Sequence, residues 1–365
     1  MLKGYQDLTR NRRTMTSLPT PNTSFNIVSL SQWWNDTYTE SAAGGQRLPL
    51  LDVRTQKDFE QQRIQHSSIL VVHSPLEFLR ARSFELPARH VEFSLLVGAS
   101  SNLEDAQTFL LGPKDSKDSQ KRKRPQQPWK VRNVVVADDN FWKQAQDLDI
   151  SSTSAPIARF PLPRLWQPDC MVRDVLLPLL KDHLALGNSE VVYDLASGAG
   201  RDVAFLAEEL LASQAKSQTP VKVIALDHRY NAKETNTVTS FFERRQVGQA
   251  TKCVQMDLSK WSTLQDSLTQ KCDVGGFFCV RFWKRSLVEE LAKAALPKGT
   301  LFAISHFCKP YVGAEWNFEH PSEKTVIERN ELRDLFHDSW EVLHDEIAMD
   351  SDHGRTMIHF VARRL

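Results

Sequence analysis

Short apolar runs alternate with amphipathic stretches along most of the chain, and this alternation predicts strands that are followed by helices. In the first half, the apolar runs of strand length cover residues 48–53, 69–72, 91–97 and 131–137. Polar stretches with helical spacing cover residues 55–62, 75–81, 103–111 and 140–145. Strands that alternate with helices in this way indicate a small parallel α/β domain.

A second alternating series occupies the C-terminal half. After a predicted helix at 171–184, the expected strands are 191–195, 221–226, 252–255, 274–280, 300–305, 340–344 and 356–362. A polar turn at 349–354 separates the last two strands, and two strands joined by a tight loop pair antiparallel. We therefore expect a seven-stranded, doubly wound, Rossmann-like sheet whose last strand is antiparallel.

Three polar segments without apolar periodicity divide the chain. Residues 1–24 read as a flexible tail, and residues 112–128 as an insertion whose basic run, Lys121–Arg124, is a solvated loop, a nuclear localisation signal or a phosphate-binding patch. Residues 151–168 are rich in Ser and Pro, which is typical of a linker. The predicted organisation is one domain at 25–150 and a second at 169–365.

The composition excludes several classes of protein. Lys and Arg number 46 against 45 Asp and Glu, so the chain lacks the basic excess of a nucleic-acid-binding protein. A hydrophobic share of 41% is too high for a disordered chain, and we find no apolar run of bilayer-spanning length. The first residues lack the apolar core of a secretory signal, and Asp7, Pro19 and Pro21 argue against a mitochondrial presequence. We expect a cytoplasmic protein with no membrane partner.

The segment from residue 191 to 202 carries the clearest chemistry. An apolar strand ends at Asp194, a turn of small residues follows with Gly198 and Gly200, and an amphipathic helix begins. At the carboxyl edge of a parallel sheet, this geometry forms a crevice for a nucleotide-like ligand, which glycines let approach the backbone closely. Asp194 either contacts that ligand or caps the glycine turn.

The spacing of the turn separates two cofactor classes. The dinucleotide fingerprint needs a third small residue, and Val203 stands in its place. The Asp-x-x-x-Gly-x-Gly arrangement from Asp194 to Gly200 instead resembles the first motif of class I S-adenosylmethionine-dependent methyltransferases, with Ala196 where that family usually has glycine. The resemblance implies S-adenosylmethionine as cofactor.

Later segments extend this resemblance over about 200 residues. It implies that Asp227 accepts the ribose hydroxyls, that Asp257 receives the adenine amino group, and that Met256 and Leu258 border the adenine ring. The cofactor-binding residues expected from it are Asp194, Ala196, Gly198, Gly200, Asp227, His228, Asp257, Leu258 and Cys279.

The acceptor side is less defined. Residues 200–206, 280–282, 305–307 and 330–340 are similar to the small-molecule branch with tellurite-resistance-type and thiol-type methyltransferases, which implies a small-molecule acceptor. Arg281 is a candidate to hold an anionic substrate, and His306 to take a proton or orient the acceptor. The alternatives are that Arg281 and Arg285 pair with Glu289 or Glu290, that His306 is a buried structural histidine, and that three aromatic residues belong to the core, namely Phe282, Trp283 and Phe307.

The N-terminal domain shows a different resemblance. Asp52-Val53-Arg54, followed by Asp58 and Phe59, resembles the opening of a rhodanese-homology domain. That family presents a catalytic cysteine after the strand that corresponds to 91–97, where this chain has residues 98–101 without sulfur. Because no cysteine precedes Cys170, a persulfide cannot form there. We expect a regulatory or partner-docking domain that is not a sulfurtransferase.

The five cysteines are scattered and never occur as CxxC pairs, so we expect neither a disulfide framework nor a metal site. The resulting interpretation is a methyltransferase with an inactive rhodanese-like domain. One alternative is a catalytically silent, cofactor-binding scaffold or regulatory protein, which Ala196 supports. Another is a protein or RNA methyltransferase that uses the loop of Lys121–Arg124.

Overall fold

The structure is a computed structural model, which describes residues 24–42, 48–65, 70–81, 83–98, 101–111, 128–153, 163–185, 191–213, 221–259, 262, 264–265, 274–350 and 354–365. It forms two compact units, residues 1–155 and 156–365, which we describe separately. The division between residues 155 and 156 falls inside the segment 151–168, whose composition is typical of a linker. The predicted tail, except Ser24, and the insertion with its basic run, except Pro128, lie outside the described residues. None of the helices in these ranges has the length and apolar character needed to cross a membrane.

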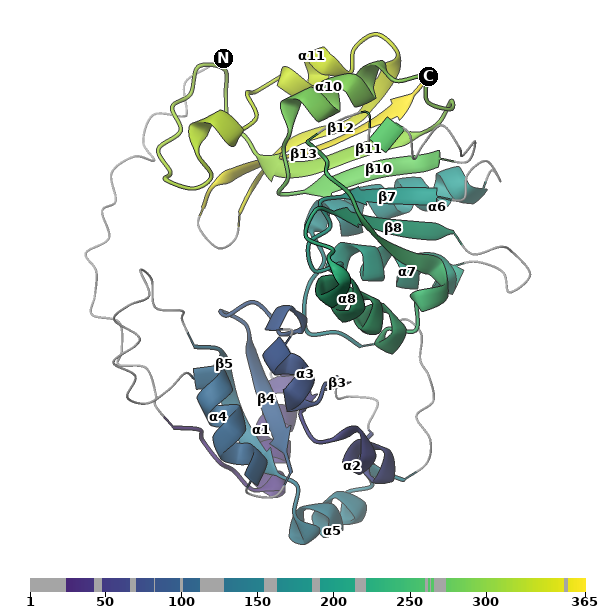
Figure 1. Ribbon diagram of the computed structural model, residues 1–365. Helices are drawn as coiled ribbons and strands as arrows, with labels where there is room; N and C mark the ends of the chain where they lie inside the picture. Colours follow the sequence, from purple (N-terminus) through teal and green to yellow (C-terminus); the bar gives the residue numbers. More distant parts are fainter. Residues whose placement is uncertain are drawn as a thin grey trace. The chain divides into compact units, whose positions relative to one another are not determined.

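Unit 1 is built on a parallel sheet of four strands in the order β3-β1-β4-β5 (Figure 1). The strands are β1 (Leu50–Asp52), β3 (Val71–His73), β4 (Glu92–Val97) and β5 (Lys130–Val136). The helices are α1 (Leu30–Ala42), α2 (Gln56–Gln61), α3 (Leu76–Ala81), η1 (Ser83–Glu85), α4 (Ser101–Leu111) and α5 (Asp139–Asp147). The predicted parallel α/β arrangement is present.

Two features of unit 1 differ from the sequence-based prediction. Helix α1 was not predicted, because its mostly polar sequence buries only a narrow stripe that includes Leu30 and Trp33. In addition, β6 (Ser151–Ser152) pairs antiparallel with β2 (Arg63–Ile64). The predicted linker therefore begins too early, since its first two residues belong to unit 1.

A buried ion pair organises the end of β1. Arg54 donates from Nη2 to Asp52 Oδ2 at 2.7 Å and from Nε to Asp52 Oδ1 at 3.0 Å, and Nη2 also reaches the Gln62 carbonyl at 2.8 Å. The guanidinium lies 4.7 Å from the centroid of the Trp142 ring. The Asp52-Val53-Arg54 sequence thus has a structural explanation, because it joins β1 to helices α2 and α5.

Unit 2 contains the seven-stranded sheet, in the order β12-β13-β11-β10-β7-β8-β9 (Figure 1). Its strands are β7 (Val191–Leu195), β8 (Lys222–Asp227), β9 (Thr251–Gln255), β10 (Val274–Val280), β11 (Leu301–Phe307), β12 (Trp340–Met349) and β13 (Thr356–Arg364). Strand β13 runs antiparallel to both β11 and β12, whereas the other pairs are parallel. The prediction of seven strands with an antiparallel last strand is confirmed.

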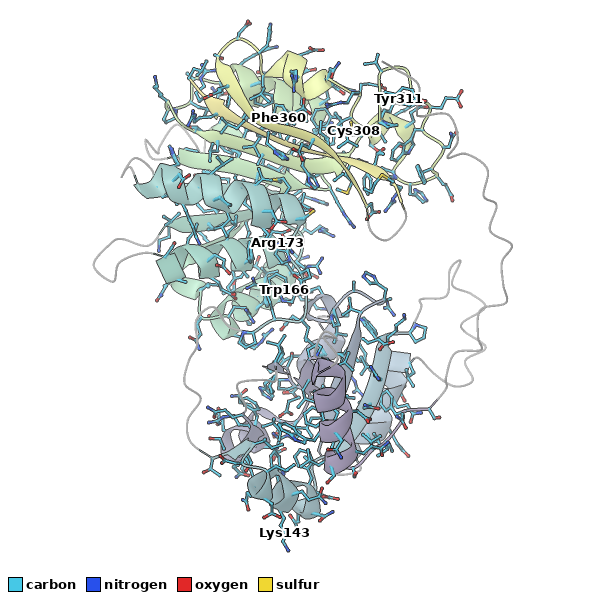
Figure 2. The ribbon with its side chains drawn as sticks, turned by 180° about the vertical axis from the view of Figure 1, so that it is seen from behind. Lys143, Trp166, Arg173, Cys308, Tyr311 and Phe360 are labelled. Atoms are coloured by element: carbon cyan, nitrogen blue, oxygen red, sulfur yellow. The ribbon has the colours of Figure 1, made fainter. Side chains whose placement is uncertain are left out.

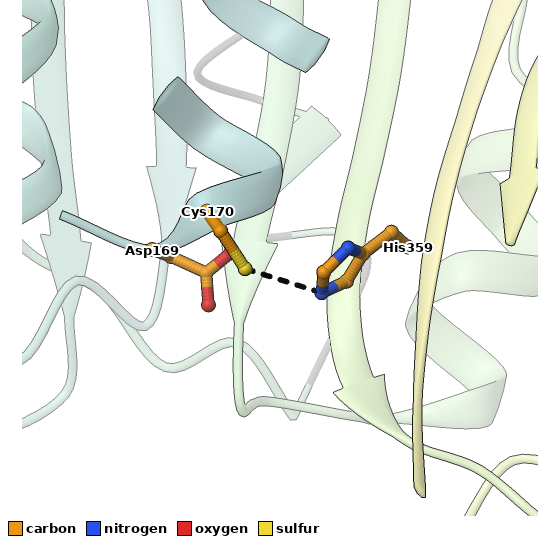
Figure 3. Close-up of side chains that lie close together, drawn as sticks. All are labelled: Asp169, Cys170 and His359. Carbon is orange, nitrogen blue, oxygen red and sulfur yellow. Dashed lines mark hydrogen bonds between the residues drawn. The ribbon is translucent and has the colours of Figure 1, made fainter. Parts of the chain in front are cut away.

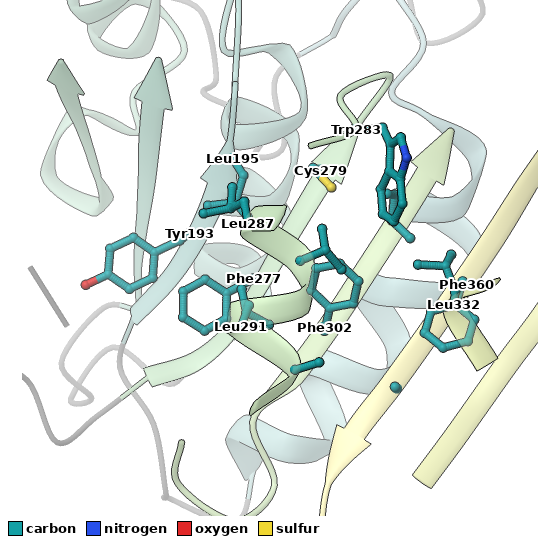
Figure 4. Close-up of a cluster of buried hydrophobic side chains, with 14 of the residues drawn as sticks. Tyr193, Leu195, Phe277, Cys279, Trp283, Leu287, Leu291, Phe302, Leu332 and Phe360 are labelled. Carbon is teal, nitrogen blue, oxygen red and sulfur yellow. The ribbon is translucent and has the colours of Figure 1, made fainter. Parts of the chain in front are cut away.

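Helices cover both faces of this sheet (Figure 1). They are the π-helix η3 (Val172–Leu176), α6 (Leu177–Ala185), α7 (Arg201–Ser213), α8 (Ala232–Arg244), η4 (Gly248–Ala250), α10 (Arg285–Lys293), η5 (Glu323–Thr325) and α11 (Glu331–Leu335). Figure 4 shows the apolar cluster between the sheet and α10, where Leu287 and Leu291 pack with Phe277 and Phe302. Burying these large side chains is the main stabilising contribution to this face.

The segment before η3, from residue 163 on, is hydrogen-bonded to α7 and to the residue that follows α8. Glu208 on α7 accepts hydrogen bonds from Arg245 Nη2 at 2.8 Å and from Arg164 Nη1 at 3.1 Å, and Arg245 Nη1 donates to the Pro163 carbonyl at 2.6 Å. Trp166 is buried beside them and, with Arg173, lies away from Cys308 and Tyr311 (Figure 2). The end of the predicted linker is therefore a packed part of unit 2.

Candidate functional site

The turn after β7 adopts left-handed backbone at three residues. The φ angles are 65° at Ala196, 60° at Gly198 and 74° at Gly200. A Cβ atom on Gly200 would lie 2.8 Å from the Phe242 ring and 2.9 Å from Val238, so glycine allows α7 to start close against α8. Ala196 adopts a conformation that costs an L-residue about 1–2 kcal/mol, and this is the position where the methyltransferase resemblance expects glycine.

Asp194, at the end of β7, is a buried acid with only 3% of its surface exposed. Burial raises the pKa of its carboxyl well above the usual value, and the nearby carboxyls of Asp202 and Asp227 raise it further, against a lowering by the Ser197 hydroxyl. The two charged groups that shift the pKa of Asp194, Asp202 and Asp227, are thus both carboxyls. Within the described ranges, no cationic side chain forms an ion pair with Asp194.

Asp202 lies beside it, in the first turn of α7. Its Oδ1 accepts a hydrogen bond from the Asp169 backbone N at 2.9 Å. Burial raises the pKa of the Asp202 carboxyl to about 6, although this hydrogen bond and the charges of Arg201 and Arg281 lower it. Sequence reasoning missed Asp202. The available signal was an acid two residues after Gly200, at a helix N-terminus where negative charge is favourable.

Asp227 ends β8, and its carboxylate is held from several sides. Oδ2 accepts a hydrogen bond from the Gly198 backbone N at 2.9 Å, and Oδ1 accepts one from the Arg229 backbone N at 2.8 Å. Arg229 also contacts Oδ1 through Nε at 3.2 Å, and His228 Nδ1 lies 3.3 Å from the same oxygen. Burial opposes ionisation, but these hydrogen bonds outweigh it and lower the pKa of Asp227.

The guanidinium of Arg229 covers the glycine turn. Its Nη2 lies 3.3 Å from Asp227 Oδ2 and 3.3 Å from the position that a Cβ on Gly198 would take. The predicted ribose-binding carboxylate is therefore already engaged by a side chain of the same chain. No sequence pattern identified this contact, because Arg229 alone reads as an exposed loop residue.

The remaining predicted cofactor residues divide into two groups. Asp257 is exposed after β9, with its carboxylate accepting from Ser259 N at 2.9 Å, and Leu258 is buried beside it. The Cys279 thiol instead packs in the apolar cluster beneath α10, with 1% of the residue exposed. The place of Cys279 in the cofactor site stays a prediction.

Arg281 lies where β10 ends, in left-handed backbone with a φ of 56°. Its backbone N donates to the Ser305 carbonyl at 2.7 Å, and its Nη2 lies 3.3 Å from Asp350 Oδ1. Asp350 also accepts from Arg355 Nη2 at 2.7 Å. A non-glycine residue held at positive φ costs about 1–3 kcal/mol and is concentrated at functional sites.

The alternative ion-pair partners considered for Arg281 and Arg285 were wrong. Arg281 pairs with Asp350, and Arg285 donates from Nη2 to Glu331 Oε2 at 3.0 Å, so neither makes its ion pair with Glu289 or Glu290. Both acids that replace them are more than 40 residues away in sequence, on elements that only the folded sheet brings near. Of the three aromatic residues, Trp283 and Phe307 are buried and Phe282 packs at the edge of the core.

His306 on β11 is 4% exposed. Its Nε2 lies 2.8 Å from the Thr325 carbonyl in η5, which requires a proton on that nitrogen, while Nδ1 is buried without a hydrogen-bond partner. Burial lowers the pKa of His306 to about 4, against the effect of the Thr325 carbonyl, and Arg281 lowers it further. The ring is therefore neutral at pH 7. A role in proton transfer stays a prediction.

No protein-family model and no curated protein matches this chain. Among solved structures, the [4+2]-cyclase SpnF is similar at 10% identity and a TM-score of 0.38, covering 52% of this chain and 79% of that one. A Burkholderia thailandensis 1,6-didemethyltoxoflavin-N1-methyltransferase with bound S-adenosylhomocysteine follows at 17% and 0.35, covering 54% and 81%. The geranyl diphosphate C-methyltransferase of Streptomyces coelicolor A3(2) gives 11% and 0.36, covering 53% and 81%. Matches at these identities and TM-scores assign no function to this chain.

Proposed function

We propose that unit 2 binds S-adenosylmethionine at the carboxyl edge of its sheet and transfers the methyl group to a small-molecule acceptor. The observation that carries this proposal is the buried carboxyl of Asp194, which has acidic neighbours in Asp202 and Asp227 and no cationic partner among the residues that the structure describes. S-adenosylmethionine brings a sulfonium and an ammonium group. A buried acid without a partner is costly unless a cation joins it.

Each neighbouring residue then has a defined part. Gly198 leaves its backbone without a Cβ on the side that the Arg229 guanidinium covers, so the ligand can approach this backbone once Arg229 moves away. Asp227 accepts the two ribose hydroxyls after Arg229 releases its carboxylate, and Asp257 accepts from the adenine amino group beside Leu258. Asp194 faces the ammonium group of the methionine part.

Methyl transfer from a sulfonium is an in-line displacement. A lone pair of the acceptor forms the new bond to the methyl carbon, the carbon–sulfur bond breaks, and its electrons neutralise the sulfonium. The protein contributes orientation and exclusion of water, so the reaction needs no conspicuous acid–base pair. Arg281, at the edge next to Ser305, is the group that we assign to hold an anionic acceptor.

Binding is tested by titrating S-adenosylmethionine calorimetrically into the full chain. We expect saturable binding that is lost in Gly198→Val, because a β-branched residue is strained at positive φ, and in Asp227→Ala. Gly248→Ala is the matched control, since a Cβ there would lie 3.5 Å from Glu243, in ordinary contact. The absence of saturable binding by the intact protein would contradict the proposal.

Turnover and acceptor class need a second experiment. We expect that methyl-labelled cofactor incubated with the protein and a cell extract transfers its label to the small-molecule fraction. Binding without label in any fraction would favour a silent cofactor-binding scaffold, a candidate supported by strained Ala196 and by the Arg229 contact on Asp227. Label in the RNA or protein fraction would instead favour the macromolecular alternative.

Unit 1 is proposed to be a rhodanese-like regulatory or partner-docking domain without sulfurtransferase activity. The support is the Asp52-Val53-Arg54 resemblance together with the lack of cysteine before Cys170. We expect the full chain to form no thiocyanate from thiosulfate and cyanide. Thiocyanate formation above the uncatalysed rate would overturn this assignment.

A further inference from the structure

Three side chains that commonly bind metals meet beside the proposed cofactor site. Asp169 and Cys170 precede η3, and His359 lies in the middle of β13, 189 residues beyond Cys170. Cys170 Sγ is 3.7 Å from His359 Nε2, and one donor atom from each of the three residues lies within 4.8 Å of the others. Figure 3 shows the thiol and the imidazole facing each other with the Asp169 carboxylate alongside.

The fold holds these groups in place. Ser305 on β11 pairs in register with His359 on β13, and its Oγ donates to Asp169 Oδ2 at 3.0 Å. The other oxygen, Oδ1, accepts from the Met171 backbone N at 3.0 Å. The carboxylate thus has a fixed orientation before any ligand arrives. Hydrogen bonds of this kind to a coordinating carboxylate are typical of the outer shell of metal sites.

The charges around the cluster favour a cation. Asp169, Asp174 and Glu346 all act on His359 as negative groups. His344 opposes them, and Arg173 pairs with Asp174 at 2.7 Å, so part of this negative charge is offset. The Cys170 side chain is exposed, which gives an ion a path from solvent.

We propose that Asp169, Cys170 and His359 form a binding site for a thiophilic divalent cation, Zn²⁺ in the first place. A tetrahedral zinc with bonds of about 2.3 Å to sulfur and about 2.0 Å to nitrogen separates those two ligand atoms by roughly 3.5 Å. The observed distance is 3.7 Å. Binding replaces the thiol proton, which leaves to solvent, and the three donor types match the ligands that zinc prefers.

Three protein ligands leave a fourth position open, which is the pattern of catalytic rather than structural zinc sites. The backbone N of Asp169 donates to Asp202, so the cluster adjoins the proposed cofactor edge. Resting on the proposed function, we assign this position to an acceptor thiol. Coordination would release its proton to solvent, and the thiolate lone pair would then take the methyl group from the sulfonium.

The site is tested by titrating Co²⁺ into the full, reduced chain without cofactor. We expect one equivalent to bind, with a sulfur-to-cobalt charge-transfer band in the near ultraviolet. Cys170→Ser should abolish the band, and His359→Gln should weaken Co²⁺ binding at least about tenfold. Cys253→Ser is the matched control, because that partly buried thiol lies outside the cluster, and it should leave the band unchanged. Circular dichroism of each variant verifies folding.

Two results would overturn the site. A band that persists in Cys170→Ser would place the metal on another cysteine, and no band in the intact protein would leave the cluster as a plain hydrogen bond between Cys170 and His359. The open position is probed with 2-mercaptoethanol, which should shift the cobalt spectrum; an unchanged spectrum would contradict the acceptor assignment. Calorimetry with S-adenosylmethionine on the same sample reports separately on the proposed function.

Discussion

The two units bury a strand-end acid in opposite ways. In unit 1, Asp52 is fully buried, and the guanidinium of Arg54, itself 4% exposed, binds both of its oxygens. In unit 2, Asp194 is 3% exposed, and its charged neighbours are other carboxyls. The first arrangement satisfies its own charge, whereas burial and acidic neighbours raise the pKa of the second acid, for which we propose the cofactor as the cationic partner.

Glu208 shows that unit 2 also contains a buried acid with cationic partners, so the contrast between Asp52 and Asp194 is not a general difference between the two units. It is buried in unit 2, yet Arg164 and Arg245 both pair with it, so unit 2 also neutralises acids that serve the fold. Asp194, by contrast, has no ion-pair partner among the residues of unit 2 that the structure describes. Burying an acid without a partner costs free energy, and perturbed buried acids are concentrated at functional sites, which supports the proposed position of the cofactor.

The largest expected effect concerns the paired acid. Asp52→Ala leaves the Arg54 guanidinium buried without its partner, which should lower the free energy of unfolding of unit 1 by about 3–5 kcal/mol in urea denaturation. Replacing both residues, as Asp52→Val with Arg54→Met, should cost much less. A loss below about 1 kcal/mol in the single variant would break the comparison, because Asp52 and Asp194 would then be equally dispensable to the fold.

The second effect is a loss of stability at low pH caused by the buried His306. The folded pKa of His306 is about 4, below its ordinary value of 6.5, so its contribution to stability is present above pH 6.5 and is lost as pH falls towards 4. The loss should reach about 3 kcal/mol. The groups facing the ring are the Thr325 carbonyl and the charge of Arg281. Urea denaturation should show a smaller decline between pH 6.5 and 4 for His306→Gln, and identical slopes would contradict burial of a neutral ring.

A smaller effect is expected at Ala196. Glycine adopts a φ of 65° without the penalty of an L-residue, so Ala196→Gly should raise the free energy of unfolding by about 1 kcal/mol. The cofactor affinity should stay equal or improve. A strong loss of affinity would indicate that the alanine methyl group contacts the ligand, and the strain at the turn would then belong to recognition.

The smallest effect sharpens the role of Arg229. Its side chain is 63% exposed, so its bond to Asp227 is screened by solvent and contributes at most about 1 kcal/mol. Arg229→Ala frees the carboxylate and should tighten S-adenosylmethionine binding by about twofold to fivefold, measured by calorimetry. Weaker binding would mean that Arg229 contacts the ligand itself.

Local patterns predicted much of unit 2. Buried strands read as apolar runs, and the glycine turn after Asp194 marks the sheet edge without any knowledge of its neighbours. Helix α1 escaped because few of its residues are apolar, and the register of β13 against β11 depends on contacts between distant segments. A few consecutive residues are enough to predict a turn, but they do not predict which distant side chain packs against that turn.

The missed parts of the site share one physical cause. Arg229 over Gly198, Asp350 beside Arg281 and Cys170 beside His359 are contacts made by tertiary packing, and no spacing in the sequence encodes them. The scattered cysteines accordingly predicted no metal site, although the sheet brings one of them to a histidine and an aspartate.

The central claim is that the unpaired carboxyl of Asp194 recognises the cationic amino-acid part of the cofactor. The direct measurement is calorimetric titration of S-adenosylhomocysteine and of methylthioadenosine, which lacks that part, into the intact protein and into Asp194→Asn. We expect the intact protein to prefer S-adenosylhomocysteine by about tenfold to a hundredfold, and the variant to bind both ligands alike with unreduced thermal stability. If Asp194→Asn keeps the same preference as the intact protein, or if the intact protein binds neither ligand, the account is wrong.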